Sequence, residues 1–346
     1  MSAPYNQFSL PLAHKQDITI CTYFKAHLAP SQEITLFEGD KSLMGFFRIL
    51  KAALAEKEYD VIHTHTPHVG FLYLVAIIIY GKSTAPTVYT VHDSYQNYKL
   101  RNKLLLIPVF AFFQRVVCCG KASFESFPAF FKWLAGDRLC FVQNGLDIAR
   151  ADRIIGKNRG SFQKGDFTVV AISRLVKIKN LFTVLKAFQQ SNDQASRLVF
   201  IGDGPLRDLL MTKSKESGLG KRIELTGLIP RDKVYEYLAQ ADLFISASRG
   251  EGLPIAVLEA MACRCPVLLS DIAPHREIVD GADFIPLVHP DDIVGFAQEI
   301  KRFRQMSPSQ RAEIGEKCRE LVEEGFSLTA MHKGYEEVYA QMLGKH

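Results

Sequence analysis

The sequence contains no apolar stretch long enough to cross a lipid bilayer. Its longest apolar runs are residues 69–81 and 104–113, shorter than the roughly 18 to 20 residues that a spanning helix needs. Residues 1–11 lack the basic and apolar segments of a secretory signal. There is also no short-period repeat and no low-complexity tract. These absences predict a globular protein of the cytoplasm.

The seven cysteines follow no pattern typical of disulfides or of a zinc site. Their number is odd and most lie in apolar segments, which indicates reduced, buried thiols. Cys263 and Cys265 are separated by one residue, which is not the paired spacing of a zinc knuckle. We therefore expect plain packing at these positions and no metal.

The 346 residues exceed one ordinary core, which predicts two domains. Residues 1–165 contain 19 Lys and Arg against 12 Asp and Glu, whereas the remainder contains 23 against 25. A basic first half suits an anionic partner, such as the inner face of a membrane or an anionic acceptor. We expect no nucleic acid. An incidental bias of a solvated surface explains the charge equally well.

Short β-rich runs recur along the chain, each followed by a helix-like segment. Several runs are continuously apolar, which is typical of parallel strands covered by helices on both faces. The pattern predicts an α/β protein with two doubly wound domains. The expected strands are residues 18–23, 61–65, 87–91, 116–119, 168–173, 198–202, 223–227, 243–247, 267–270 and 284–288.

The polar and basic residues 150–166 are expected to link the two domains. We therefore place an N-terminal domain at residues 1–158 and a C-terminal domain at residues 159–327. The tail, residues 328–346, has apolar residues at helical spacing. It is expected to form an amphipathic helix over residues 328–343 that packs on another surface.

Ligands of open α/β sheets bind beyond the carboxyl ends of the strands, so polar residues that follow strands are candidates. Arg174 and Lys179 follow the first strand of the second domain and precede a helix, a placement that suits a phosphate. Gly202 and Gly204 open a dinucleotide-like fingerprint after the next strand, but Arg207 replaces its third glycine. We expect this turn to bring the backbone close to a ligand without binding NAD.

Two glutamates bracket the apolar run in GEGLPIAVLEA. Glu251 lies in a loop, and Pro254 suits the first turn of a helix that we expect to run through Met261. The start of that helix offers free N–H groups to a pyrophosphate. Glu259 leans back toward the same end. The two carboxylates are therefore expected to accept hydrogen bonds from a sugar and a ribose on either side of a diphosphate.

The chain resembles the family 4 glycosyltransferases of the GT-B fold. The matching segments over residues 167–345 are SRLVKIKN, FIGDGP, ELTGLIPRDKVYEYLAQADLFISASRGEGLPIAVLEAMACRCPVLLSD and REIVDG, and their order and spacing agree with the family. YDVIHTHTPHVGFL, VYTVHD and FVQNGLD extend the resemblance upstream more weakly. The resemblance implies two Rossmann-like domains facing across a cleft, with the tail helix crossing back to the first.

The resemblance further implies a retaining transfer of a hexose-type sugar, without a metal or other cofactor, from a UDP- or GDP-linked donor to a glycan, lipid or small-molecule acceptor. The implied catalytic residues are Glu251, His92, Arg174 and Lys179. The implied donor-binding residues are Arg174, Lys179, Gly202, Gly204, Leu228, Ile229, Glu251, Gly252, Leu253, Pro254, Ile255 and Glu259. No second carboxylate nucleophile is evident, and the resemblance therefore favours same-face substitution, with the donor phosphate as base, over double displacement.

Several alternatives remain open. His92 also fits a satisfied histidine at a strand end with Asp93 as its partner. The histidines of HTHTPH, at positions 63, 65 and 68, look metal-like, but the end of a parallel strand explains them equally well. The alternative function is a catalytically weak glycosyltransferase-like protein that binds a nucleotide sugar. An epimerase on the same fold fits the two-glutamate spacing less well.

Two positions depart from the family pattern. Residues 1–16 resemble the family's first helix, so its usual opening strand and glycine-rich loop are expected to be missing. Arg264 stands where the family often has glycine. The first departure is the reason for keeping the weakly active alternative.

Overall fold

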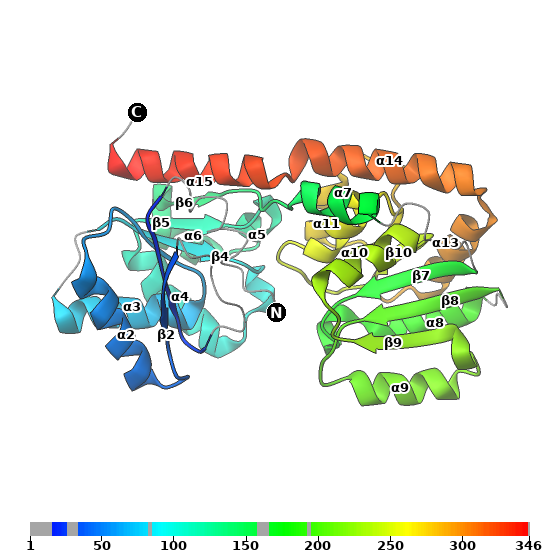
Figure 1. The fold of residues 1–346 in the computed structure, drawn as a ribbon, viewed down its shortest axis with the longest axis horizontal. Helices are drawn as coiled ribbons and strands as arrows, with labels where there is room; N and C mark the ends of the chain where they lie inside the picture. The colour runs from blue at the N-terminus through cyan, green and yellow to red at the C-terminus, as the bar shows by residue number, and fades with distance from the viewer. Residues whose placement is uncertain (1–15, 26–33, 82–84, 158–165, 192–194, 345–346) are drawn as a thin grey trace. The chain divides into compact units, whose positions relative to one another are not determined.

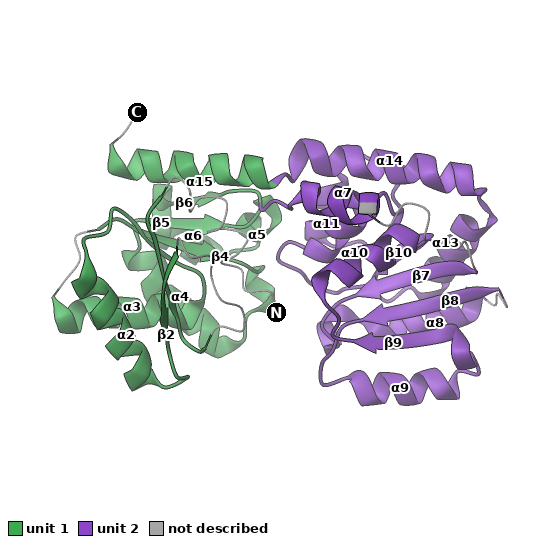
Figure 2. Ribbon diagram, viewed as in Figure 1, with its two compact units in different colours: residues 1–143, 328–346 green, residues 144–327 purple. Residues whose placement is uncertain are grey.

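The computed structural model describes residues 16–25, 34–81, 85–157, 166–191 and 195–344. The chain divides into two compact units, residues 1–143 with 328–346 and residues 144–327 (Figure 2). The first boundary lies earlier than the predicted 158/159. Residues 150–157 are not a linker: they belong to helix α7 (Ile148–Lys157), whose Ala151 and Ile154 are buried. Asp152 and Arg153 lie between these two positions, so the sequence shows no long apolar periodicity there.

The second unit is built on a six-stranded parallel sheet in the order β12-β11-β10-β7-β8-β9. Figure 1 labels β10, β7, β8 and β9 of this sheet. Most of its strand residues are apolar and buried, because helices cover both faces. The strands are β7 (Phe167–Ile172), β8 (Ser196–Ile201), β9 (Ile223–Gly227), β10 (Leu243–Ser246), β11 (Val267–Ser270) and β12 (Leu287–Val288). The other helices are α8 (Leu181–Ser191), α9 (Arg207–Glu216), α10 (Arg231–Gln240), α11 (Ile255–Ala262), α12 (Ala273–Val279), α13 (Ile293–Gln305) and α14 (Pro308–Gly325).

The first unit contains a four-stranded parallel sheet in the order β3-β4-β5-β6 and a two-stranded parallel sheet, β1-β2. No strand pairing joins these two sheets within the described residues. The strands are β1 (Ile18–Thr22), β2 (Ile34–Glu38), β3 (Ile62–Thr64), β4 (Thr87–Val91), β5 (Arg115–Cys118) and β6 (Leu139–Phe141). The helices are α2 (Leu43–Glu56), α3 (Pro67–Tyr80), α4 (Leu100–Phe112), α5 (Lys121–Glu125), α6 (Ala129–Ala135) and α15 (Leu328–Leu343).

Helix α15 belongs to the first unit although it follows the whole second unit in sequence. Its buried side chains form one apolar cluster with residues of β4 and β5 and with Val142. Gly334 allows the close approach, since a Cβ there would lie 2.8 Å from Cγ1 of Val142. The expected helix over residues 328–343 is therefore present, with the same bounds.

Each of the ten expected strands overlaps an observed one. The strands β2 and β6 were not predicted. β6 spans only three residues and ends in an exposed phenylalanine, so it lacks a continuously apolar run. The predicted helix over residues 1–16 falls almost entirely outside the described residues, and the predicted loss of an opening strand is not confirmed.

Candidate functional site

The loops after β7 and β10 bring two predicted residues into direct contact. Nζ of Lys179 donates to Oε2 of Glu251, and the two side chains are 20% and 11% exposed. β7 and β10 are neighbours in the parallel sheet, so their carboxyl ends share one edge. The backbone N–H of Arg249 donates to the carbonyl of Ile178 at 2.8 Å. This bond holds the two loops together, so the contact between lysine and glutamate follows from the backbone.

The turn that carries Lys179 is held in place by hydrogen bonds of Asn180. It ends at Asn180, which is buried and has a left-handed backbone (φ 53°). Asparagine tolerates this conformation better than most residues. Its Nδ2 donates to the carbonyl of Pro290 at 2.7 Å, and its Oδ1 accepts from the Thr183 hydroxyl at 3.1 Å. Arg174, at the start of the same loop, is exposed.

Gly202 and Gly204 approach the protein's own backbone. A Cβ at Gly202 would lie 2.0 Å from the carbonyl oxygen of Ser173, and one at Gly204 would lie 2.7 Å from that of Leu175. Both glycines have positive φ, 133° and 159°. The close approach in the structure is therefore to the loop that carries Arg174. Contact between these glycines and a ligand stays a prediction.

Glu259 lies on α11 and is buried, with 4% of its surface exposed. It forms an ion pair with Arg231 and accepts a hydrogen bond from the Tyr235 hydroxyl at 3.2 Å, and both partners lie on α10. Burial raises the pKa of the Glu259 carboxyl, while the charge of Arg231 opposes that rise. Glu259 therefore joins α10 to α11, a structural role that the sequence did not indicate.

The other predicted donor-binding residues surround the start of α11 and the turn after β9. Helix α11 begins at Ile255, one residue after the predicted start. Leu253 and Pro254 are buried, whereas Gly252 is partly exposed. Leu228 is exposed in the turn after β9, followed by the partly exposed Ile229.

His275 is a residue that the sequence analysis missed. It lies on α12, just beyond the carboxyl end of β11, and is fully buried. Its Nδ1 donates to the carbonyl of Ser270 at 2.8 Å. Burial lowers its pKa to about 4, and the negative charge of Glu251 partly opposes this shift. Its position directly after a strand was the available signal.

In the first unit, His92 follows β4 and lies against another histidine. Its Nε2 is 3.2 Å from Nδ1 of His65. Oδ1 of Asp93 instead accepts from the Ser94 N–H at 2.9 Å and from the Asn97 side chain at 2.5 Å. The described hydrogen bonds of the Asp93 carboxylate are thus to Ser94 and Asn97, and that of the His92 ring is to His65. The role of His92 toward a sugar stays a prediction.

Five histidines, at positions 63, 65, 68, 92 and 275, have pKa values lowered mainly by burial, to about 3 for His63 and to about 4 for His92 and His275. The ordinary pKa of histidine is 6.5. At a pH between the lowered value and 6.5, the unfolded chain therefore binds more protons than the folded one. Stability is therefore expected to fall as the pH falls below about 6.5, approaching about 1.4 kcal/mol per histidine per pH unit. Urea unfolding at about pH 7 and about pH 5 measures this effect. Equal stability at both values would contradict it.

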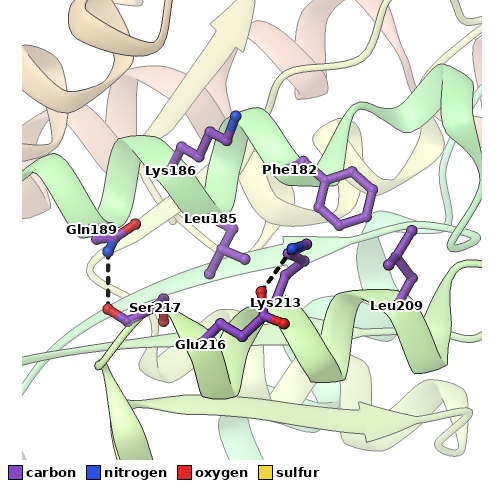
Figure 3. Close-up of a pocket in the computed structure, with 8 residues that line it drawn as sticks. All are labelled: Phe182, Leu185, Lys186, Gln189, Leu209, Lys213, Glu216 and Ser217. Atoms are coloured by element: carbon purple, nitrogen blue, oxygen red, sulfur yellow. Dashed lines mark hydrogen bonds and ion pairs between the residues drawn. The ribbon is translucent and has the colours of Figure 1, made fainter.

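A cavity of about 450 Å³ lies between α8 and α9 (Figure 3). Phe182, Leu185 and Leu209 give it an apolar wall, and Lys213 pairs with Glu216 at its edge. None of the predicted site residues lines it.

Within the described part of the chain, no group of three His, Cys, Asp or Glu side chains is placed to hold a metal ion. No described helix could cross a membrane.

Comparison with known proteins identifies related sequences. Residues 152–321 match the family described as Glycosyl transferases group 1, and residues 13–150 match Glycosyltransferase Family 4. The UDP-Gal:alpha-D-GlcNAc-diphosphoundecaprenol alpha-1,3-galactosyltransferase of Escherichia coli is 26% identical over 370 residues. That match covers 98% of this chain and 91% of the relative.

Solved structures agree with the sequence matches. Sucrose-phosphate synthase from Thermosynechococcus elongatus has a TM-score of 0.82 at 18% identity, covering 99% of this chain and 92% of that one. Anabaena HepE in complex with UDP and glucose has a TM-score of 0.74 at 20% identity, covering 89% and 86%. These likenesses confirm a GT-B fold of two Rossmann-like domains. With its two parallel-sheet units and family matches over both halves, the chain belongs to family 4 of the glycosyltransferases.

Proposed function

We propose that this protein is a retaining glycosyltransferase that moves a hexose from UDP to a glycan or lipid-linked acceptor. The observation that carries the proposal is the contact between Lys179 and Glu251 at the carboxyl edge of the second sheet, beside the start of α11. A cation, a carboxylate and a helix N-terminus there suit a diphosphate and a sugar. UDP is favoured because the Escherichia coli relative is named for UDP-Gal and HepE was solved with UDP.

The proposed role of the site residues is to stabilise the charge that develops in the reaction. As the bond between the anomeric carbon and the phosphate oxygen breaks, negative charge grows on the diphosphate and positive charge on the sugar ring. Lys179, Arg174 and the N–H groups at the start of α11 stabilise the diphosphate. The acceptor hydroxyl attacks from the same face and passes its proton to the leaving phosphate. No covalent sugar–enzyme bond is required.

The contact between Lys179 and Glu251 is proposed to open when the donor binds. Lys179 then turns to the diphosphate, and Glu251 accepts hydrogen bonds from sugar hydroxyls. Each charge stabilises the other while the site is empty, which limits the cost of keeping both partly buried. The pair therefore keeps two unlike functional groups in position with little unpaired charge.

Glu259, which lies on α11, is proposed to bind the ribose of the donor, whereas Glu251 binds the sugar. Both of the contacts that hold it use Oε1, so Oε2 is the oxygen that we assign to the ribose hydroxyls. Because Arg231 and Tyr235 fix the carboxylate before any ligand arrives, no side-chain freedom is lost on binding.

The acceptor is proposed to be presented at the inner face of a membrane, with the protein in the cytoplasm. Support comes from large apolar side chains of the first unit that are exposed on α4 and α6 and lie beside basic residues. Amphipathic surfaces of this kind bind anionic lipid headgroups. The exposed apolar residues are Leu100, Leu104, Phe112, Phe130 and Trp133, and Lys99 and Arg101 are exposed at the start of α4.

A thermal-shift panel with UDP, GDP, ADP and their sugar conjugates tests the donor. We expect stabilisation by UDP and by one UDP-sugar, since a ligand at about 100 times its Kd adds about 2.7 kcal/mol to the stability of the folded state. ADP is the control. Binding of a UDP-sugar without UDP release in the presence of glycan and lipid-linked acceptors would favour the weakly active alternative. A response to GDP alone would overturn the choice of UDP.

A further inference from the structure

A chain of hydrogen bonds crosses the first unit from α15 to the carboxyl end of β3. His63 is the centre of this chain: its Nδ1 lies 2.7 Å from the Tyr339 hydroxyl and its Nε2 lies 2.6 Å from the Thr90 hydroxyl. Thr90 in turn lies 3.0 Å from the Tyr335 hydroxyl. Both nitrogens of His63 are therefore occupied, which fixes the plane of its ring.

His65 lies between that fixed ring and His92. Its ring centre is 4.2 Å from that of His63, with the two planes 31° apart. On the other side, its ring centre is 5.3 Å from that of His92, with the planes 32° apart. The hydrogen bond between Nδ1 of His65 and Nε2 of His92 joins the two. The orientation of His92 is thus set by a stack that begins at α15.

The bond between the two histidines allows two arrangements of the proton at the facing nitrogens, with either His65 Nδ1 or His92 Nε2 as the donor. Burial lowers the pKa of both rings, so both are neutral near neutral pH. A hydrogen bond then requires that one facing nitrogen carries a hydrogen and the other does not. A neutral imidazole has one N–H, so this choice also decides whether the far nitrogen of His92, Nδ1, donates or accepts.

We propose that His65 is a positioning residue that fixes the tautomer and the ring orientation of His92, and thereby the kind of hydrogen bond that His92 offers to the reacting sugar. The proposal rests on the proposed function in one respect, since it takes His92 as the residue that faces the sugar. The placement of the proton between the two rings does not depend on that assignment.

The direct test is nitrogen-15 NMR of the full chain labelled at histidine, which shows which ring nitrogens carry hydrogen. In the wild-type protein, we expect one protonated and one unprotonated nitrogen at the facing positions. In His65→Phe, which keeps a flat ring but cannot bond, His92 is expected to change tautomer or become a mixture. In His65→Asn, whose side-chain amide lies near the place of Nδ1, a single tautomer is expected to return.

His68→Phe is the matched control, because this histidine comes from the same HTHTPH segment and packs edge-on against Tyr23 rather than against His92. It is expected to leave the His92 signals unchanged. If His65→Phe also leaves them unchanged, or if both facing nitrogens carry the same proton state in the wild type, the proposal is wrong. Urea unfolding of each variant shows whether it is folded. If His65→Phe does not fold, the His92 signals of His65→Asn still test the proposal.

Activity provides a second, separate readout. His65→Phe is expected to lower kcat for UDP release by about 10- to 100-fold, with KM for the donor changed by less than about threefold, because misorientation of one reacting group costs rate rather than binding. His65→Asn is expected to recover most of that loss. If His92→Ala keeps full activity, the sugar-facing role of His92 fails, while the NMR result still decides whether His65 fixes its tautomer.

Discussion

Replacing Lys179 with methionine is expected to slow the release of UDP from a UDP-sugar by about 100- to 1000-fold, the usual cost of losing one preorganised charge at a developing anion. Methionine keeps the length and apolar stem of lysine but has no charge to offer the diphosphate. The substitution also removes the cation that Glu251 contacts. UDP release in the absence of acceptor measures the effect without knowledge of the acceptor.

Lys177→Met is the matched control, since Lys177 lies two residues earlier in the same turn and is exposed. It is expected to change the rate by less than about twofold, as exposed charges contribute little. Similar losses in both variants would remove the specific role of Lys179. Glu251→Gln separates the partners further, because it is expected to abolish turnover while the affinity for UDP itself stays close to that of the wild type.

Replacing Glu259 with alanine is expected to lower the free energy of unfolding by about 3 kcal/mol, because it leaves the largely buried Arg231 guanidinium without the carboxylate that it contacts. Arg231 is 25% exposed at its side chain, so water recovers part of a cost that is larger for fully buried pairs. The Tyr235 hydroxyl loses its acceptor in the same change. Urea unfolding of the ligand-free protein measures the loss.

Asp232→Ala is the control on the same helix, because Asp232 pairs with Arg150 at an exposed position and is expected to contribute less than about 1 kcal/mol. Glu259→Gln tests the ribose role, since it preserves the shape of the side chain. If it binds UDP as tightly as the wild type, the ribose assignment is wrong. If Glu259→Ala is as stable as the wild type, the ion pair does not hold α10 to α11.

The strands of the second sheet could be predicted because each is a continuous apolar run, the pattern that burial on both faces imposes. The environments of the two glutamates could not. Glu251 and Glu259 both flank an apolar run, yet one contacts a lysine from another loop and the other contacts Arg231 on a different helix. Partners that are far apart in sequence are set by tertiary packing, which periodicity does not report.

The departure at Arg264 has a backbone explanation that the sequence alone did not supply. Arg264 follows the end of α11 and has φ 59°, the left-handed conformation that favours glycine at this position. Its side chain bonds Glu316 at 2.9 Å, and its carbonyl faces Gly315, where a Cβ would lie 2.1 Å away. The strain at Arg264 is thus offset by contacts to α14.

The discontinuous course of the first unit sets an order for folding during synthesis. Residues 144–327 form one uninterrupted segment, so the second unit can fold as soon as it leaves the ribosome. The first unit is made earlier but lacks α15, which covers Val88, Val117 and Val142. Those valines therefore stay open to chaperones or to aggregation until residue 338 has emerged. For most of translation, the half of the protein that is made first is the half that remains unfinished.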